Sequence, residues 1–358
     1  MPAPTREAVI DALRGVQDPE LHKDIVSLGM VKLADLRDGT ASLVVTLTTP
    51  ACPLRETIER DIRAALAPLG VREVKLHFDA KVPAGRAVAD KAALPGVKNL
   101  VAVASGKGGV GKTTVAVNLA IALGRMGSAV GLLDADVYGP NVPVMLGTAA
   151  EPKALDERTI LPVEAYGVKM ISMGLLNPGD RPLIWRGPML HSVLQQFLRN
   201  VRWGELDYLI ADLPPGTGDV ALSLVQSVPL AGAVIVTTPS IVSLADVRKA
   251  VEMFRQVNVE ILGVVENMSY LACPHCSKRI DIFGHGEGRR MAEGFGVPFL
   301  GEIEIEPQIR VGGDTGKPVS AFGEDFAGAR SFYAVARQVA ARLSVVNLGA
   351  SAPVVQIL

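Results

Sequence analysis

The stretch that most constrains the fold is a glycine-rich loop between an apolar run and a helical pattern. Residues Ser105 to Thr114 read SGKGGVGKTT, directly after the run LVAVAS, and they open the pattern TTVAVNLAIALGRMG. Gly106, Gly111, Lys112 and Thr113 have the spacing of the Walker A motif. This agreement between spacing and context predicts a strand–loop–helix unit that binds phosphate.

The residue types in this loop fit the chemistry of a nucleotide. Glycines let backbone N–H groups close around phosphate oxygens, and the helix N-terminus adds partial positive charge. We expect Lys112 to reach the β and γ phosphates of ATP and the Thr113 hydroxyl to ligate Mg²⁺. The loop residues expected to bind the cofactor are Gly106, Lys107, Gly108, Gly109, Val110, Gly111, Lys112, Thr113 and Thr114.

Short apolar runs alternate with helical patterns from Asn99 onward. They read LVAVAS, AVGLLDAD, YLIADLP, AGAVIVTTP, EILGVVENM and VPFLGEI. Runs of this kind are typical of strands buried on both faces, so we expect an α/β, P-loop NTPase fold: a mostly parallel sheet with helices on both faces. Such sheets bind ligands at the carboxyl ends of their strands. The polar residues at these ends are Ser105, Asp134, Asp136, Asp212, Thr237 and Asn267.

Two of these strand ends suggest specific contacts. Asp212 suits a carboxylate beside Mg²⁺, where its charge is held near the cation; the alternative is a helix cap or loop aspartate. The amide of Asn267 is suited to read the N6 and N7 edge of adenine, and an ordinary turn asparagine is the alternative. For Asp134, a role in the site and a purely structural role at the end of its strand are equally compatible with the sequence.

The first part of the chain has a different texture. Residues 1–78 predict a small α+β domain, with a helix in TREAVIDALRGV, two strands around the turn pair Asp38-Gly39, a helix in LRETIERDIRAALAPLG and a strand in VREVKLHF. Residues 79–98 are rich in Ala, Gly and Pro without periodicity, which is typical of a linker. We expect residues 99–345 to form the ATPase domain and 346–358 a C-terminal tail.

Composition argues against several classes of function. The net charge is −1 and aromatic residues make up 4%, so we expect neither nucleic-acid nor membrane binding. No run approaches the ~18 apolar residues of a membrane span, and the N-terminal MPAPTREAVIDALRG has no signal-peptide core. With 3 cysteines the chain has no disulfide framework, so we predict a cytoplasmic protein.

A CxxC pair stands in LACPHCSKRI, with Cys273 and Cys276 on either side of Pro274 and His275. It is compatible with a redox pair, half of a zinc site or a pair of iron–sulfur ligands. Zinc and iron–sulfur sites need about four soft ligands. One chain supplies two in this motif, and a symmetric dimer would supply the other two. A thioredoxin-like pair is expected at a helix N-terminus, whereas the flanks here predict a polar turn region after a strand.

Lys107 adds a second lysine to the loop, giving KGGVGKT. Taken alone, Lys107 is compatible with an ordinary solvated lysine of the loop. This pattern resembles the deviant Walker A loop of the ATPases that include ParA, MinD, nitrogenase iron protein and the Mrp proteins. The resemblance implies nucleotide-sandwich dimers in which Lys107 contacts the partner's phosphates. It also implies that Asp136 helps position the attacking water or Mg²⁺, so the catalytic candidates are Lys107, Lys112, Asp136 and Asp212.

Longer stretches are similar to the Mrp/ApbC family of iron–sulfur cluster carriers. They include LLDADVYGPNVPVMLG, WGELDYLIADLPPGTGD, ILGVVENMSYLACPHC and IRVGGDTGKPV, within about residues 98–343. VQDPELHKDIVSLGMV and TLTTPACPLRE resemble a small iron–sulfur assembly domain that is often fused to Mrp proteins. The chain departs from the family's FGxGGG pattern with FGHGEG, where His285 is an extra ligand or, as we favour, a loop residue.

The resemblance implies slow ATP hydrolysis, a homodimer, and a 4Fe–4S cluster bridged by Cys273 and Cys276 of two chains and passed to apo iron–sulfur proteins. It also supports a reactive or relay role for Cys52, whose position at an apparent helix start is expected to lower its thiol pKa; a buried inert cysteine is the alternative. Two other hypotheses remain: a ParA- or MinD-like positioning ATPase, and a scaffold that binds ATP without turnover.

Overall fold

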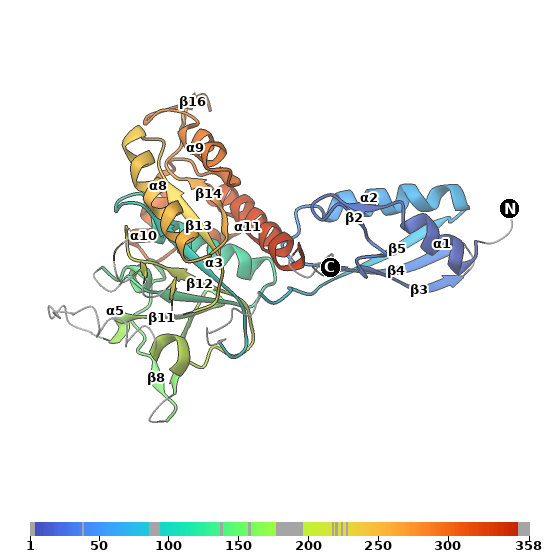
Figure 1. The fold of residues 1–358 in the computed structure, drawn as a ribbon, viewed down its shortest axis with the longest axis horizontal. Helices are drawn as coiled ribbons and strands as arrows, with labels where there is room; N and C mark the ends of the chain where they lie inside the picture. Colours follow the sequence, from blue (N-terminus) through green and yellow to red (C-terminus); the bar gives the residue numbers. More distant parts are fainter. Residues whose placement is uncertain are drawn as a thin grey trace, which may run out of the picture. The chain divides into compact units, whose positions relative to one another are not determined.

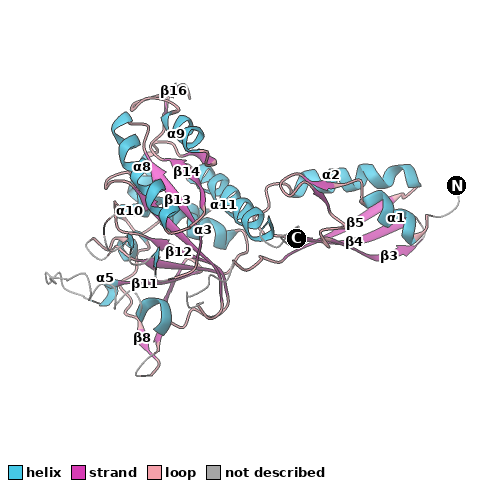
Figure 2. Ribbon diagram, in the orientation of Figure 1, coloured by secondary structure: helices cyan, strands magenta, loops and turns pink. Residues whose placement is uncertain are grey.

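The computed structural model describes residues 4–37, 39–85, 94–136, 139–156, 159–176, 196–216, 218, 221–222, 225–226 and 228–349. The chain divides into two compact units, Met1–Pro83 with Ala340–Leu358, and Ala84–Val339 (Figure 1). Each unit has its own helices and sheet, as Figure 2 shows. No helix among the described residues has the length and hydropathy needed to cross a membrane.

The first unit is a small α+β fold. Strand β4 alternates buried and half-buried residues along its length, so one face of its sheet is covered. Helices α1 and α2 cover that face, where Val9 and Ile62 pack with Leu43 in one core. The elements are α1 Arg6–Leu13, β1 Gln17–Asp18, β2 Lys23–Asp24, β3 Val31–Arg37, β4 Thr40–Leu47, α2 Arg55–Leu66, the short 3₁₀ helix η1 Ala67–Leu69, and β5 Glu73–Ala80.

The predicted hairpin of this unit is confirmed. Strands β3 and β4 pair in antiparallel register up to Arg37 opposite Thr40. Gly39 in the turn has φ of +78°, a left-handed conformation that favours glycine. Asp38, the other predicted turn residue, lies outside the described residues. Strand β5 then pairs parallel with β4, which completes the sheet order β3-β4-β5 within the described part of this unit.

The second unit is built on the predicted mostly parallel sheet. Its described strands lie in the order β10-β11-β7-β12-β6-β13-β14-β17. Every described pairing is parallel except β10 with β11 at one edge. The strands are β6 Val97–Ser105, β7 Val130–Asp134, β10 Val163–Ala165, β11 Val168–Ser172, β12 Leu206–Asp212, β13 Leu230–Thr237, β14 Ile261–Glu266 and β17 Phe299–Glu302.

Helices cover both faces of this sheet, as predicted. On β6, Leu100 and Ala102 belong to a core shared with Phe254 of α8. Successive strand residues point to opposite faces, so Val101 and Val103 face the other side, where α3 contacts the sheet. The helices whose bounds are described are α3 Lys112–Arg125, α4 Val142–Met145, α5 Met173–Leu176, α8 Ile241–Gln256, α9 Glu287–Phe295, α10 Pro307–Asp314, η2 Val319–Phe322 and α11 Ala329–Gly349. Helix α11 begins in this unit, and its residues from Ala340 onward belong to the first unit.

Smaller two-stranded ribbons are added to this core. They are β8 Lys153–Ala154 with β9 Ile160–Leu161, and β15 Leu271–Ala272 with β16 Arg279–Ile280, both antiparallel. The predicted linker, residues 79–98, begins inside β5 and ends inside β6, and its residues 86–93 lie outside the described part. The domain boundaries stay predictions.

Candidate functional site

The glycine-rich loop joins β6 to α3, as predicted. Gly106 lies so close to α8 that a Cβ built on it would be 2.2 Å from the carbonyl carbon of Asp246. Gly111 has φ of +78°, and a Cβ there would lie 2.2 Å from Nδ2 of Asn267. Gly106 therefore requires glycine because it packs against the backbone of α8. Gly111 requires glycine for its left-handed conformation and for the close approach of the Asn267 side chain. The loop that results opens directly onto the N-terminus of α3, which begins at Lys112.

Lys112, Thr113 and Asp212 form a buried polar cluster at this helix start. The Lys112 ammonium lies 2.5 Å from Oδ1 of Asp212, and the Thr113 hydroxyl donates to Oδ2 at 2.7 Å. Burial raises the pKa of Asp212, while the positive charge of Lys112 opposes that shift. Hydroxyl and carboxylate oxygens are ligands that Mg²⁺ prefers, so the pair Thr113 and Asp212 fits a magnesium ion beside the phosphate loop.

Two further aspartates follow β7. Asp134 lies in register with Asp212 on the neighbouring strand and is buried. Its carboxylate accepts hydrogen bonds from the Ser172 hydroxyl at 2.8 Å and from the Asp136 backbone N–H at 3.2 Å. Burial, with the charge of Asp212, raises the pKa of Asp134 to about 7. Asp134 thus shapes the backbone that carries Asp136, which is only partly buried.

Substitution of Asp134 by asparagine should stabilise the protein at neutral and alkaline pH. The folded-state pKa of about 7 is above the unfolded value of 3.8. Ionisation of Asp134 therefore favours unfolding, and native stability falls as the pH rises from about 4 to about 7. Asparagine removes this cost, so urea titrations at pH 8 should show a gain on the order of 4 kcal/mol over wild type. The gain should shrink toward pH 4; a pH-independent difference would contradict this origin.

Asn267 sits on the opposite side of the loop, after β14. Its Nδ2 donates to the Val110 carbonyl at 2.8 Å, which ties the strand end to the phosphate loop. Beside it lies a largely apolar cavity of about 650 Å³ that reaches Thr113 and Thr114. The other residues that line it are Asn141, Val144, Met145, Met268, Ile282, Phe283, Glu304, Ile305, Glu306, Ile309, Arg310, Gly313 and Asp314. Its position next to the phosphate loop and its size suit a purine base and ribose.

The cysteine pair lies in the turn of the β15–β16 ribbon. The Cys273 N–H donates to the Lys278 carbonyl at 2.9 Å, and the Ser277 N–H donates to the Cys273 carbonyl at 2.8 Å. Hydrogen bonds from the backbone N–H groups of His275 and Cys276, and from the Cys276 side chain, lower the pKa of the Cys273 thiol. Cys273 is partly exposed and Cys276 is exposed. The pair therefore lies in an accessible turn, in which the Cys273 thiol has a lowered pKa.

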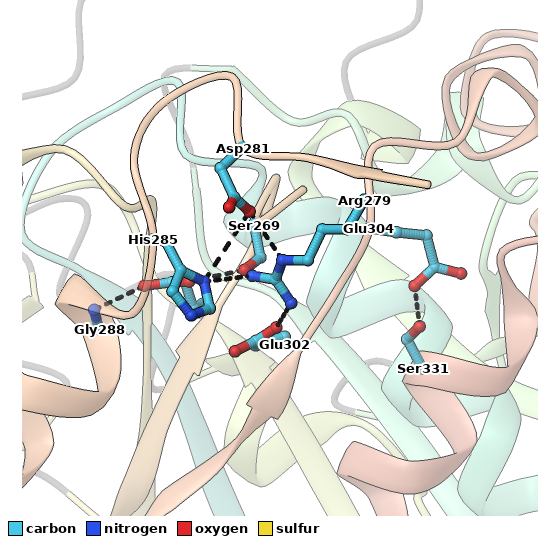
Figure 3. Close-up of polar contacts among 9 residues, drawn as sticks. Ser269, Arg279, Asp281, His285, Gly288, Glu302, Glu304 and Ser331 are labelled. Carbon is cyan, nitrogen blue, oxygen red and sulfur yellow. Dashed lines mark hydrogen bonds and ion pairs between the residues drawn. The ribbon is translucent and has the colours of Figure 1, made fainter. Parts of the chain in front are cut away.

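One chain does not complete a metal site around these cysteines. Among the residues that the structure describes, no group of three or more His, Cys, Asp or Glu is placed to hold a metal ion. The Nδ1 atom of His285 lies 2.7 Å from a nitrogen of the Arg279 guanidinium (Figure 3). Cys276 is exposed and Cys273 is partly exposed, so both thiols are open to further ligands.

The expected low pKa of Cys52 is wrong. Cys52 lies just before α2, and the backbone N–H groups of Leu54 and Arg55 do favour its thiolate. Burial has the larger effect, and the charges of Glu20 and Asp18 act in the same direction. Together they raise the pKa of the thiol to about 11. A thiol with this pKa is protonated at neutral pH, so the structure does not make Cys52 a ready nucleophile.

The structure also shows a site residue that sequence reasoning missed. Glu266, the last residue of β14, is fully buried next to Asn267. Its carboxylate accepts from the Ser269 hydroxyl at 2.6 Å and from the Gly288 N–H at 2.5 Å. A charged residue that ends an otherwise apolar strand was the available signal, since buried carboxylates need partners.

A parallel sheet with a Walker A loop after β6 and a buried aspartate ending the adjacent β12 defines a P-loop NTPase. Residues 96–340 match the family described as NUBPL iron-transfer P-loop NTPase (ParA), and residues 6–76 match the family described as iron-sulfur cluster assembly protein. The chain belongs to the iron-transfer P-loop NTPase family and carries the assembly domain at its N-terminal side.

Relatives support this assignment over nearly the whole chain. An iron-sulfur cluster carrier protein of Deinococcus radiodurans is 53% identical, across 96% of this chain and 97% of that protein. A protein of the same name from Synechocystis is 49% identical, across 96% and 99%.

Among solved structures, a nucleotide-binding protein of Archaeoglobus fulgidus in complex with ADP is 38% identical, with a TM-score of 0.57 over 63% of this chain and 88% of that one. The Pyrococcus furiosus cell division ATPase MinD is 25% identical, with a TM-score of 0.51 over 67% and 98%. The MinD likeness is one of fold, and the family match favours an iron–sulfur carrier over a positioning ATPase.

Proposed function

We propose that this protein is an ATP-dependent carrier that holds a 4Fe–4S cluster between two copies of the chain and passes it to apo iron–sulfur proteins. The observation that carries the proposal is the combination, in one compact unit, of the Lys112–Thr113–Asp212 cluster with an exposed CxxC turn. The relatives, which are iron-sulfur cluster carrier proteins, support an iron–sulfur cluster as the cargo. The absence of a membrane-crossing helix among the described residues is compatible with the expected cytoplasmic location.

Different residues of the site bind the phosphates, the base and Mg²⁺, and position the attacking water. Backbone N–H groups of the loop and the Lys112 ammonium bind the phosphates, and Asn267 with the apolar cavity binds the base. Thr113 and Asp212 hold Mg²⁺, which neutralises the charge that develops on the phosphates. Asp136, close enough to Asp212 to raise that residue's pKa, positions the attacking water.

A homodimer supplies two parts that one chain lacks: the remaining cluster ligands, and a lysine that contacts the nucleotide of the other chain. Cys273 and Cys276 of two chains give the four thiolates that a 4Fe–4S cluster needs. The cluster is cargo, and the exposed turn holds it where an acceptor's cysteines have access. Lys107 has no ion-pair partner among the described residues, which leaves its ammonium available to the partner's phosphates.

Replacing Lys107 with alanine should lower ATP hydrolysis by about 10²-fold or more while nucleotide still binds, because a trans cation acts on transition-state charge. Phosphate release and binding of a fluorescent ATP analogue separate the two effects. Mixing Lys107→Ala with Lys112→Ala chains should restore about a quarter of wild-type hydrolysis, since half of the dimers then contain one complete site. No recovery in the mixture would show that Lys107 acts on its own chain's nucleotide.

Anaerobic reconstitution tests the carrier function directly. The purified full-length chain, incubated with iron and sulfide, should become a brown dimer with broad visible absorbance and about four irons per dimer. Addition of an apo 4Fe–4S acceptor should move that absorbance to the acceptor, and hydrolysis of ATP should require Mg²⁺. A chain that stays colourless and retains zinc would contradict the proposal.

A further inference from the structure

Cys273 and Cys276 lie in an excursion of the chain, residues Ser269–Gly288. Both ends of this excursion bind the buried carboxylate of Glu266. Glu266 binds Ser269 at the start of the excursion through Oε1 and Gly288 at its end through Oε2. The Gly288 N–H belongs to the first turn of α9, so the same carboxylate also caps that helix. Residues between Ser269 and Gly288 are therefore tied to the end of β14, and they have to respond to movement of that strand end.

The strand end is itself in contact with the phosphate loop. Asn267 follows Glu266 directly, its amide donates to Val110, and it occupies the space beside Gly111. No flexible spacer separates these contacts: the residue that holds the loop and the residue that holds the excursion are neighbours in sequence. Displacement of the loop by bound phosphates is thus passed to Glu266 through one peptide bond.

Arg279 makes the middle of the excursion rigid. Figure 3 shows its guanidinium between Asp281, His285 and Glu302, with 2.7 Å to each of the two carboxylates. It also lies 4.3 Å from the centre of the Tyr270 ring. Glu302 ends β17, so this network joins the cysteine ribbon to the central sheet at a second point. The ribbon is consequently held as one body at its base as well as at the strand end.

The excursion returns past the nucleotide cavity. Ile282 and Phe283 follow the ribbon directly and line the same cavity as Thr113, Thr114 and Asn267. Phe283 remains 51% exposed, so about half of its side chain is free to be covered by a ligand. A base or ribose in the cavity must contact, or displace, the segment that carries the cysteines.

We propose that residues Ser269–Gly288 form a lever through which nucleotide in the cavity changes the accessibility of Cys273 and Cys276. Its inner end is the wall made by Ile282 and Phe283, its anchors are Glu266 and Arg279, and its tip is the cysteine turn. The inference rests on the proposed function only in that the cavity binds nucleotide. It assigns Phe283 and Arg279 as positioning residues that link the two sites.

The test measures alkylation of each thiol by iodoacetamide in the full-length, metal-free chain, with and without a non-hydrolysable ATP analogue and Mg²⁺. Peptide mass spectrometry resolves the three cysteines. Nucleotide should change the rates at Cys273 and Cys276 by about fivefold or more, the lower end of ordinary coupling between sites. Cys52, which belongs to the other compact unit, should be unaffected and serves as an internal control.

At an analogue concentration that saturates each variant, the effect of nucleotide on alkylation should fall to less than about twofold in Phe283→Ala, because the contact that couples the sites is gone. Phe322→Ala is the matched control: Phe322 is 52% exposed and does not line the cavity, so coupling should remain as in wild type. Arg279→Gln should likewise bind nucleotide normally and lose the response of the thiols. Light scattering on each sample reports the mass.

Three results would overturn the inference. Nucleotide that binds wild type without changing thiol reactivity contradicts the lever and leaves the carrier function standing. A change that persists in full in Phe283→Ala contradicts the assigned coupling contact. A change that occurs only when the mass doubles shows instead that a second copy protects the thiols. Failure of wild type to bind the analogue contradicts the proposed function and the lever together.

Discussion

Replacing Lys112 with alanine should abolish measurable turnover, lowering ATP hydrolysis by about 10²-fold or more, the scale seen when one transition-state donor is removed. The structure adds a second expected effect. Lys112 is 6% exposed and its partner Asp212 is fully buried, so the substitution leaves a buried carboxylate without its cation. Urea titration at neutral pH should show a loss of about 3 kcal/mol in unfolding free energy.

A double variant separates catalysis from stability. Lys112→Met with Asp212→Asn replaces the ion pair by a neutral pair of similar volume, and the asparagine oxygen can still accept from the Thr113 hydroxyl. Stability should return close to that of wild type, because no buried charge is left unpaired. Hydrolysis should stay absent. Unchanged turnover in Lys112→Ala would contradict the assignment of this loop, and a stability loss that persists in the double variant would contradict the ion-pair explanation.

The phosphate site was predictable because its chemistry is local and its geometry follows from the sheet. Lys112 and Thr113 stand within one contiguous motif, and Asp212 ends a parallel strand whose carboxyl end must lie beside that of β6. The same argument brought Asn267 to the loop, where the structure places it. These residues needed only the spacing of the motif and the period of the apolar runs.

The strands between β7 and the nearer edge of the sheet, β11 and β10, were harder to predict. Strand β11 has the sequence VKMIS, in which Lys169 interrupts the apolar run, and it was not expected. The lysine is tolerated because its ammonium donates to the Trp203 carbonyl at 2.7 Å, a partner 34 residues away. Such a contact depends on tertiary structure and leaves no periodic signal.

The anchors of the cysteine excursion escaped prediction for the same reason. Glu266 and its partner Gly288 are 22 residues apart, and Arg279 reaches Glu302 across 23 residues. Cys52 shows a different error. A position at a helix start does lower a thiol pKa, but burial raises the pKa of Cys52 by more. Helix-start N–H groups do lower its pKa, yet the desolvation that outweighs them comes from packing that no local pattern reveals.

Under the proposed bridging arrangement, replacing either Cys273 or Cys276 should be enough to remove the cluster. In a two-fold dimer, Cys273→Ser takes away two of the four thiolates at once, and Cys276→Ser does the same. Iron retained after anaerobic reconstitution and desalting should therefore fall by at least about tenfold in either variant, well beyond the effect of weakening a single supporting contact. Both positions are in a partly or fully exposed turn, so the fold should not change.

Cys52→Ser is the matched control for this prediction. Its thiol is half-buried in the other compact unit and has a raised pKa, so iron content and visible absorbance should equal those of wild type. Binding of a fluorescent ATP analogue should be retained in all three variants, because no residue of the phosphate loop is altered. A brown monomer in wild type would contradict the bridging arrangement even if both CxxC variants lose iron, since four ligands would then have to come from one chain.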